Sequence, residues 1–237
     1  RASTARGAWP GFTIATSGRA HDRGLIPGSN PMPPHVRDRL RFFAQWLRNP
    51  RQLASITPSS LELAAAILAE LPEGTRRVIE LGGGTGAITA ALLASGIRDS
   101  ELLVLELNTD LQAQLARDFP RSVVLRGDAA DLPRLARESG YLDAGPADAV
   151  VSGLGLLAME REAQARILRA AFECLRPDGA FLQFTYGPVS PVRDELRDEL
   201  GLVGRHGAFV LRNVPPATVW TYRRSRARAI KPRSVVR

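Results

Sequence analysis

A glycine-rich loop between an apolar strand and an apolar helix is the part of this 237-residue sequence whose residue types most clearly indicate chemistry. Val78-Ile79-Glu80-Leu81 leads into Gly82-Gly83-Gly84-Thr85-Gly86, and Ala87-Ile88-Thr89 follows. Glycines permit a tight turn and let the backbone approach a ligand closely. No Gly-Lys-Ser/Thr follows the loop, and its glycine spacing differs from the dinucleotide fingerprint. The loop therefore indicates a ligand site outside these two common phosphate-binding patterns.

Carboxylates follow the next two apolar strands of the sequence. Glu106 lies near the end of the segment Leu102–Leu107, and Asp128 follows the segment Val123–Arg126. A carboxylate at the end of the second strand can accept both hydroxyls of a ribose. Taken singly, each acid is typical of a solvated loop. Glu80, Glu106 and Asp128 occur in order at consecutive strand ends, which favours a cofactor site.

Glu80 followed by Gly82-x-Gly84-x-Gly86 closely resembles motif I of the class I S-adenosylmethionine-dependent methyltransferases. The resemblance implies that the loop lies beneath the methionine part of the cofactor, that Glu106 binds the ribose, and that Asp128 reads the adenine amino group. It also implies S-adenosylhomocysteine as the product and no metal. The cofactor-binding residues that it implies are Ser59, Ser60, Glu80, Gly82, Gly83, Gly84, Thr85, Gly86, Glu106, Leu107, Asp128, Ala129, Ser152 and Gly153.

The fourth strand ends in Ser152-Gly153-Leu154-Gly155. In the class I methyltransferases that the sequence resembles, the end of the fourth strand normally carries the residues nearest the transferred methyl group. Nucleic-acid adenine methyltransferases have an Asn/Asp-Pro-Pro-Tyr/Phe type of sequence here, whose amide and aromatic ring hold a flipped base. Both groups are missing from this segment, so the sequence argues against base methylation.

Five further segments share a narrower pattern: Phe42-Phe43-x-x-Trp46 with Asn49-Pro50, Ile56-Thr57-Pro58-Ser59-Ser60, Val151-Ser152-Gly153-Leu154, Gln183-Phe184-Thr185-Tyr186-Gly187-Pro188 with Pro191, and Val214-Pro215-Pro216-Ala217-Thr218-Val219-Trp220. With them, residues 35–224 resemble the bacterial phospholipid N-methyltransferases. That resemblance implies a monomeric cytoplasmic enzyme at the inner face of the cytoplasmic membrane, which methylates phosphatidylethanolamine stepwise towards phosphatidylcholine. Gly155 stands where the family usually has Pro, and this departure bears on the number of methyl groups added.

Tyr186 and Ser152 are the candidate catalytic residues. The Tyr186 ring can hold a methylated ammonium by cation–π contact, and its hydroxyl can orient the attacking nitrogen. The alternative is a core tyrosine whose hydroxyl is satisfied within the protein. The sulfonium methyl group is already a good electrophile, so the enzyme mainly needs to align a neutral amine. Ser59, Ser60 and Ser152 are candidates to orient that amine, and no general base is evident.

The net charge of +8 is distributed unevenly along the chain. Residues 1–60 carry nine Arg and two Asp, and residues 223–237 carry seven basic groups and no acid, whereas the intervening body is acidic. Basic ends are typical of proteins that meet the phosphates of nucleic acid or of anionic lipid. The single Cys174 excludes an intramolecular disulfide framework. No apolar run is long enough to span a bilayer, so we expect any membrane contact to be peripheral.

The segment His35–Arg48 is predicted to be a basic amphipathic helix with aromatic residues at the border of its apolar face. Such a helix can lie in the interface of an anionic bilayer. Alternatively, it packs its apolar stripe on the domain and solvates its arginines. The predicted membrane-binding residues are Arg37, Arg41, Phe42, Trp46 and Arg48.

Apolar strands separated by helices predict an α/β fold with a doubly wound, Rossmann-like methyltransferase sheet, preceded by N-terminal amphipathic helices. We expect a loosely attached extension at 1–34, two helices within 35–71, a catalytic domain at 72–224 and a basic tail at 225–237. The predicted strands are Arg77–Leu81, Glu101–Leu107, Val123–Arg126, Ala147–Ser152, Ala180–Tyr186 and Thr218–Arg223. The predicted helices are Leu61–Leu71, Ala87–Ala94, Asn108–Phe119, Leu132–Glu138, Arg161–Cys174 and Pro191–Leu200.

Two other functions remain open at this point. An RNA adenine methyltransferase-like enzyme, or an RNA-binding methyltransferase, would use the basic ends to hold RNA, but it predicts a base-stacking motif or aromatic residues on a basic sheet face. Neither is present in the sequence. A catalytically inactive cofactor-binding protein is disfavoured by the three intact acids.

Overall fold

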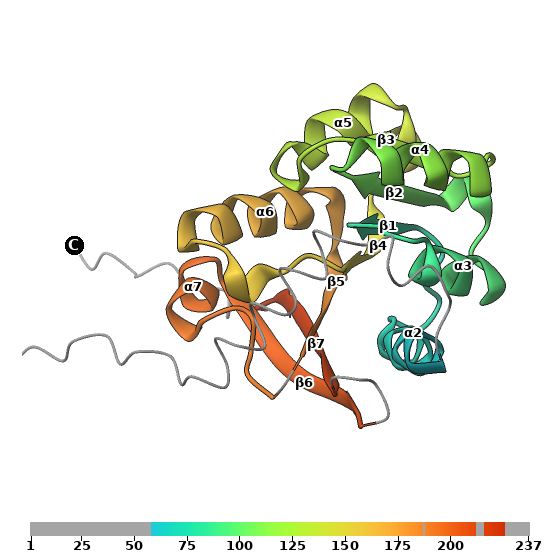
Figure 1. Ribbon diagram of the computed structural model, residues 1–237. Helices are drawn as coiled ribbons and strands as arrows, with labels where there is room; N and C mark the ends of the chain where they lie inside the picture. Colours follow the sequence, from blue (N-terminus) through green and yellow to red (C-terminus); the bar gives the residue numbers. More distant parts are fainter. Residues whose placement is uncertain (1–57, 187, 212–215, 226–237) are drawn as a thin grey trace, which may run out of the picture. The chain divides into compact units, whose positions relative to one another are not determined.

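Seven strands form one sheet in the computed structural model, which describes residues 58–186, 188–211 and 216–225 (Figure 1). The strand order across the sheet is β3-β2-β1-β4-β5-β7-β6. The first five strands are parallel, and β7 runs antiparallel to both of its neighbours, β5 and β6. The strands are β1 Val78–Leu81, β2 Leu102–Glu106, β3 Val123–Arg126, β4 Ala147–Ser152, β5 Leu175–Tyr186, β6 Leu202–Val210 and β7 Ala217–Arg224.

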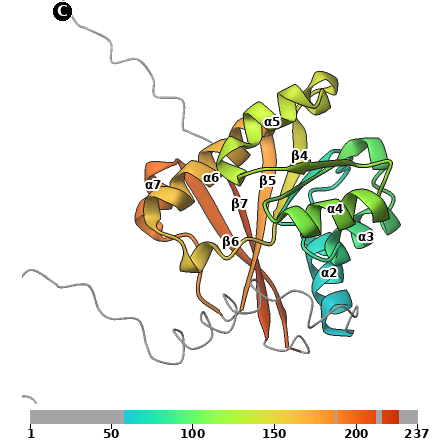
Figure 2. The ribbon, with the colours of Figure 1, turned by 45° about the horizontal axis from the view of Figure 1, so that its top comes forward.

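Helices cover both faces of this sheet and bury two apolar layers against it. Ile67, Leu92 and Leu115 bring α2, α3 and α4 into one layer, and α5, α6 and α7 contribute to the other. Figure 2 shows α2 and α3 on one side of the strands, with α6 and α7 on the other. The helices are α2 Pro58–Glu70, α3 Ala87–Ala94, α4 Thr109–Asp118, α5 Leu132–Glu138, α6 Arg161–Cys174 and α7 Asp194–Glu199.

The central strands are apolar runs because the sheet is covered on both faces. Every residue of Val78–Leu81 and Leu102–Glu106 is buried. Two of these buried residues, Glu80 and Glu106, are acids. They are exceptions to the apolar pattern, and both lie near the carboxyl ends of their strands.

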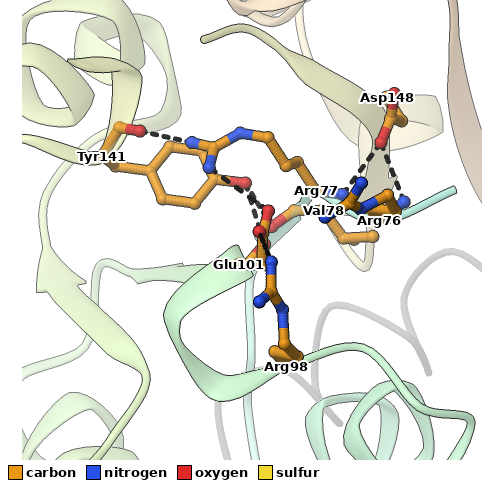
Figure 3. A network of polar contacts seen from close by, with 7 residues as sticks. All are labelled: Arg76, Arg77, Val78, Arg98, Glu101, Tyr141 and Asp148. Atoms are coloured by element: carbon orange, nitrogen blue, oxygen red, sulfur yellow. Dashed lines mark hydrogen bonds and ion pairs between the residues drawn. The ribbon is translucent and has the colours of Figure 1, made fainter. Parts of the chain in front are cut away.

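A polar network ties β1 to its neighbours at the amino edge of the sheet (Figure 3). The Tyr141 hydroxyl lies 3.0 Å from the carbonyl oxygens of both Val78 and Glu101. The Arg77 guanidinium lies 4.4 Å from the centre of the Tyr141 ring, and the Arg77 backbone N–H donates to Asp148 over 2.9 Å. Burial raises the pKa of Tyr141, so its hydroxyl remains a donor. These contacts stabilise the edge opposite the strand ends that carry the predicted site.

The predicted α/β class and doubly wound order are confirmed, and the structure adds one strand that we did not predict. β6 contains Gly204 and Gly207, and between its buried ends, Leu202 and Val210, all positions are exposed or partly buried, so it lacks the apolar run of a central strand. Its place at the edge of the sheet explains that pattern. The predicted helix at 35–48, the extension 1–34 and the tail beyond Ser225 lie outside the described residues.

Candidate active site

The register of the sheet brings four strand ends together. Leu81 of β1 pairs with Leu105 of β2 on one side and with Ser152 of β4 on the other. Ser152 in turn pairs with Gln183 of β5. Backbone bonds continue this pairing past the strands, since the Gly153 N–H donates to the Leu81 carbonyl oxygen over 2.8 Å. The predicted motifs therefore converge at the carboxyl edge, where ligands bind in open α/β sheets.

The glycine loop leaves β1 through three residues with positive φ, namely Gly82 at 76°, Gly84 at 56° and Gly86 at 83°. At Gly86 a Cβ atom would lie 2.6 Å from the Phe119 ring, so packing as well as conformation requires glycine there. Among the described residues, a Cβ atom at Gly84 would meet only the Gly82 carbonyl oxygen, at 3.9 Å. Packing of the described residues therefore does not explain why glycine stands at the middle of the loop.

Glu106 joins the glycine loop to the second strand. Its Oε2 atom accepts from the Gly84 N–H over 3.0 Å, and its Oε1 atom accepts from the Asn108 N–H over 2.9 Å. The residue is 8% exposed. Two backbone donors thus fix both oxygens of a carboxylate at the edge of the sheet, and each oxygen retains further acceptor capacity. Leu107, the next residue, is 66% exposed.

Glu80 is a buried acid directly behind the loop. Its Oε2 atom accepts from the Thr89 hydroxyl of α3 over 2.6 Å, whereas Oε1 has no hydrogen-bond partner among the described residues. Burial raises the pKa of Glu80 to about 8, and the charge of Glu106 adds to this rise. Glu80 is therefore mostly protonated at neutral pH in the protein without ligand.

The other predicted site residues occupy the same edge with different exposure. Asp128 is exposed, and its side chain accepts from the Ala130 N–H over 2.8 Å, which begins the short turn η3, Ala129–Asp131. Ser152 is buried, and its hydroxyl oxygen lies 3.3 Å from the Leu154 N–H. Tyr186 is half-buried at the end of β5 and makes an edge-to-face contact with Phe184 at 6.1 Å. Asp128 and Tyr186 are therefore exposed enough for their side chains to contact a ligand.

Two groups of predicted residues have no described side chains. Ser59 and Ser60 lie in the first turn of α2, and nothing is placed beyond their backbone. The predicted membrane-binding residues lie outside the described residues. Their roles remain predictions from the sequence.

Gln183 also lies in this region, and we predicted no role for it from the sequence. Its Nε2 atom donates to the Leu154 carbonyl over 2.8 Å and to the Phe184 carbonyl over 2.7 Å, while its Oε1 atom has no partner within the described part of the chain. It thereby fixes the loop that follows Ser152. The signal in the sequence was an amide in the otherwise apolar run Ala180-Phe181-Leu182-Gln183-Phe184.

The described residues contain neither a metal-ligand cluster nor a membrane-spanning helix. Within them, no group of three or more His, Cys, Asp or Glu side chains is placed to hold a metal ion. Nor does any helix in this part of the chain have the length and apolar character needed to cross a membrane.

The strand order, the glycine loop and the acids at the strand ends define a class I methyltransferase that uses S-adenosylmethionine, and the chain belongs to this family. Residues 78–179 match the family described as "Methyltransferase domain". Within that class, the chain is related to the lipid N-methyltransferases. It is 32% identical over 188 residues to an ornithine lipid N-methyltransferase from Singulisphaera acidiphila, covering 77% of this chain and 94% of that protein.

Two other proteins are similar to this chain, one over part of its sequence and one in its fold. A ribosomal RNA small subunit methyltransferase A from Thermosynechococcus vestitus is 42% identical over only 95 residues, which is 39% of this chain and 31% of that protein. A solved 1,6-didemethyltoxoflavin-N1-methyltransferase from Burkholderia thailandensis has a TM-score of 0.56 at 20% identity, covering 84% of this chain and 94% of the other. The structural similarity shows the fold alone.

Proposed function

We propose that this protein methylates the amine of phosphatidylethanolamine and of its methylated intermediates, working peripherally at an anionic membrane surface. The observation that carries the proposal is the similarity to an ornithine lipid N-methyltransferase over 94% of that protein's length. Both lipids would present an amine to the enzyme at a bilayer surface. The choice of phosphatidylethanolamine as the substrate rests on the sequence motifs at 42–60, 151–154, 183–191 and 214–220, which resemble those of the phospholipid N-methyltransferases.

The carboxyl edge of the sheet fits the cofactor of this family. No described residue packs closely on the Cβ position of Gly84, the Glu106 carboxylate is fixed at the edge, and a buried oxygen of Glu80 has no hydrogen-bond partner among the described residues. We assign the methionine part to the Gly82–Gly86 loop, the ribose to Glu106, and the adenine to Asp128 beside Leu107 and Ala129. Bound there, S-adenosylmethionine supplies a methyl group on a positively charged sulfonium.

The acceptor side of the site is assigned to β4 and β5. Ser152, with the backbone at Gly153, orients the lipid amine, and the half-buried Tyr186 ring accommodates the ammonium that forms. Ser59 and Ser60 at the start of α2 are assigned to the same acceptor side of the site. Alignment of a neutral amine is the main contribution required of these residues, and the released proton passes to water.

Replacing Gly84 with Ala tests the loop assignment against a matched control. Gly84 at φ +56° and Gly74 at φ +71° both have left-handed backbones, and no described atom lies closer than 3.9 Å to the Cβ position of either, but only Gly84 lies in the loop. Each substitution is expected to lower the free energy of unfolding by about 1 kcal/mol. Only Gly84→Ala should weaken S-adenosylmethionine binding in calorimetry, by roughly tenfold. Equal cofactor affinity of the two variants would contradict the assignment.

RNA methylation is the second candidate function, because ribosomal RNA methyltransferases are among the relatives. That similarity spans 31% of the relative, whereas the similarity to the ornithine lipid N-methyltransferase spans 94% of that protein. It is therefore weaker support for a shared activity. The Ser152–Gly155 segment also lacks the amide and ring that hold a flipped base. We therefore place lipid methylation first.

The headgroup is tested with vesicles that contain either phosphatidylethanolamine or ornithine lipid at equal content. We expect mass spectrometry to show added methyl groups on phosphatidylethanolamine, and the number added reports how far the reaction proceeds with Gly155 in place of Pro. Methylation of ornithine lipid alone would overturn phosphatidylethanolamine as the proposed substrate but would still support methylation of a lipid amine. The predicted membrane-binding residues, Arg37, Arg41, Phe42, Trp46 and Arg48, are proposed to hold the protein at the vesicle surface.

A further inference from the structure

Gln183 on β5 carries a buried polar atom that the described part of the protein does not satisfy. The residue is 1% exposed, and its Oε1 atom has no hydrogen-bond partner among the described residues. A buried acceptor without a partner is unfavourable, because it has lost its hydrogen bonds to water and gained none in exchange. Such an atom requires an explanation.

Two hydrogen bonds fix the orientation of the Gln183 amide. Its Nε2 atom donates to the Leu154 carbonyl over 2.8 Å and to the Phe184 carbonyl over 2.7 Å. Carbonyl oxygens only accept, so the nitrogen must face them and Oε1 must face away. Trp220 of β7 pairs with Gln183 in the sheet, but its indole N–H is also unpartnered within the described ranges and does not donate to Oε1. The acceptor is therefore held in a fixed position.

The register of the sheet places this acceptor beside the amine position. Ser152 of β4 and Gln183 of β5 are register partners on parallel strands, which lie side by side in Figure 2. The side chains of register partners project from the same face of a sheet, and their strands are about 5 Å apart. Ser152 is the residue assigned above to orient the lipid amine. An amine held there lies within reach of the Gln183 side chain.

Gln183 also contacts the loop that adjoins the cofactor side of the site. Leu154, whose carbonyl accepts from Gln183, packs against the glycine loop, since a Cβ atom at Gly82 would lie 3.1 Å from the Leu154 side chain. The Gly153 N–H donates to the Leu81 carbonyl over 2.8 Å. One side chain thus adjoins both the amine position and the loop assigned to the methyl donor.

We infer that the Oε1 atom of Gln183 accepts a hydrogen bond from an N–H of the substrate amine and so favours headgroups whose nitrogen still carries hydrogen. The inference rests on the proposed function and adds a residue that contacts the substrate. The bond uses an N–H and leaves the nitrogen lone pair free to attack the methyl group. The quaternary nitrogen of phosphatidylcholine has no hydrogen, so this product leaves Oε1 unpaired again, which favours its release.

Gln164 on α6 provides a matched control. It is also a buried glutamine, and its Nε2 atom donates to the carbonyls of Leu156 and Met159 over 2.6 and 3.3 Å, just beyond the loop that Gln183 holds. It leaves no buried oxygen unpartnered within the part of the chain that the structure describes. Gln164→Met therefore removes a similar pair of structural bonds without removing the proposed acceptor.

The test measures the affinity of each variant for short-chain, monomeric phosphatidylethanolamine and phosphatidylcholine by calorimetry, with S-adenosylhomocysteine present. Gln183→Met is expected to weaken binding of phosphatidylethanolamine about tenfold and that of phosphatidylcholine by less than about twofold. Gln164→Met should change both affinities by the same factor. Gln183→Glu keeps a side-chain oxygen and should retain the preference for phosphatidylethanolamine.

The two lipids separate substrate contact from a purely structural role. A structural role alone predicts that Gln183→Met weakens both lipids equally, and that result would overturn the inference while leaving the proposed function intact. Loss of the preference in Gln183→Glu would also contradict an oxygen acceptor at this position. If the unchanged protein methylates no lipid amine, the proposed function fails, and this inference fails with it.

Discussion

Glu106→Ala is expected to weaken S-adenosylmethionine binding by roughly 1.5–3 kcal/mol, as for the loss of charged hydrogen bonds. This corresponds to about 10- to 150-fold in the dissociation constant measured by calorimetry. The substitution removes the carboxylate assigned to the ribose. It also leaves the Gly84 and Asn108 N–H groups without the acceptors that they have at 3.0 and 2.9 Å. Part of the loss therefore comes from a less well positioned glycine loop.

Two controls separate ribose binding from loop positioning. Glu106→Gln keeps one side-chain carbonyl oxygen for a loop N–H but loses the charge, so its affinity should lie between those of the unchanged protein and Glu106→Ala. Glu138→Ala removes an exposed acid that pairs with Arg134 on α5, and it should leave cofactor affinity unchanged. An unaltered dissociation constant in folded Glu106→Ala would refute the assignment.

Glu80→Gln is expected to remove a large pH dependence from the stability of the protein without ligand. The pKa of Glu80 is about 8 in the folded chain, compared with an ordinary value of 4.5. Between these values the folded chain holds a proton that the unfolded chain has released. The free energy of unfolding must therefore fall as pH rises, by up to about 1.4 kcal/mol per pH unit.

Urea unfolding between pH 5 and 8 measures this effect. We expect Glu80→Gln to gain roughly 2–4 kcal/mol over the unchanged protein towards pH 8, because its amide never has to ionise in a buried site. The amide oxygen can still accept from the Thr89 hydroxyl, so the fold is preserved. Glu138→Gln, an exposed counterpart, should follow the unchanged protein. Parallel pH profiles for Glu80→Gln and the unchanged protein would show that Glu80 is ionised throughout.

Local patterns in the sequence were sufficient to predict the central elements. Three elements have the bounds predicted for them: Ala87–Ala94, Val123–Arg126 and Ala147–Ser152. Glycines and polar turn residues flank the apolar runs there, so the ends of these elements are marked in the sequence. β6 was missed because an edge strand needs little apolar burial, and its glycines weaken the strand pattern. Its antiparallel pairing depends on β7, which follows it in sequence.

The site could be predicted in outline but not in its electrostatics. The positions of Glu80 and Glu106 follow from strand ends in a parallel sheet, which the sequence contains. The burial of Glu80 depends on α3 packing over β1 through Thr89, and this contact between elements has no local signature. The role of Gln183 likewise depends on Leu154, in the loop after β4, because only the folded sheet brings its carbonyl oxygen within 2.8 Å of the Gln183 Nε2 atom.

Transfer of label from S-adenosylmethionine, with vesicles and bulk RNA present together, tests the central claim most directly. The unchanged protein is expected to label the phosphatidylethanolamine fraction, whereas Glu106→Ala at the same cofactor concentration should label it far less. RNA should remain unlabelled at every stage of the reaction. Label in RNA with none in the lipid fraction would contradict the account.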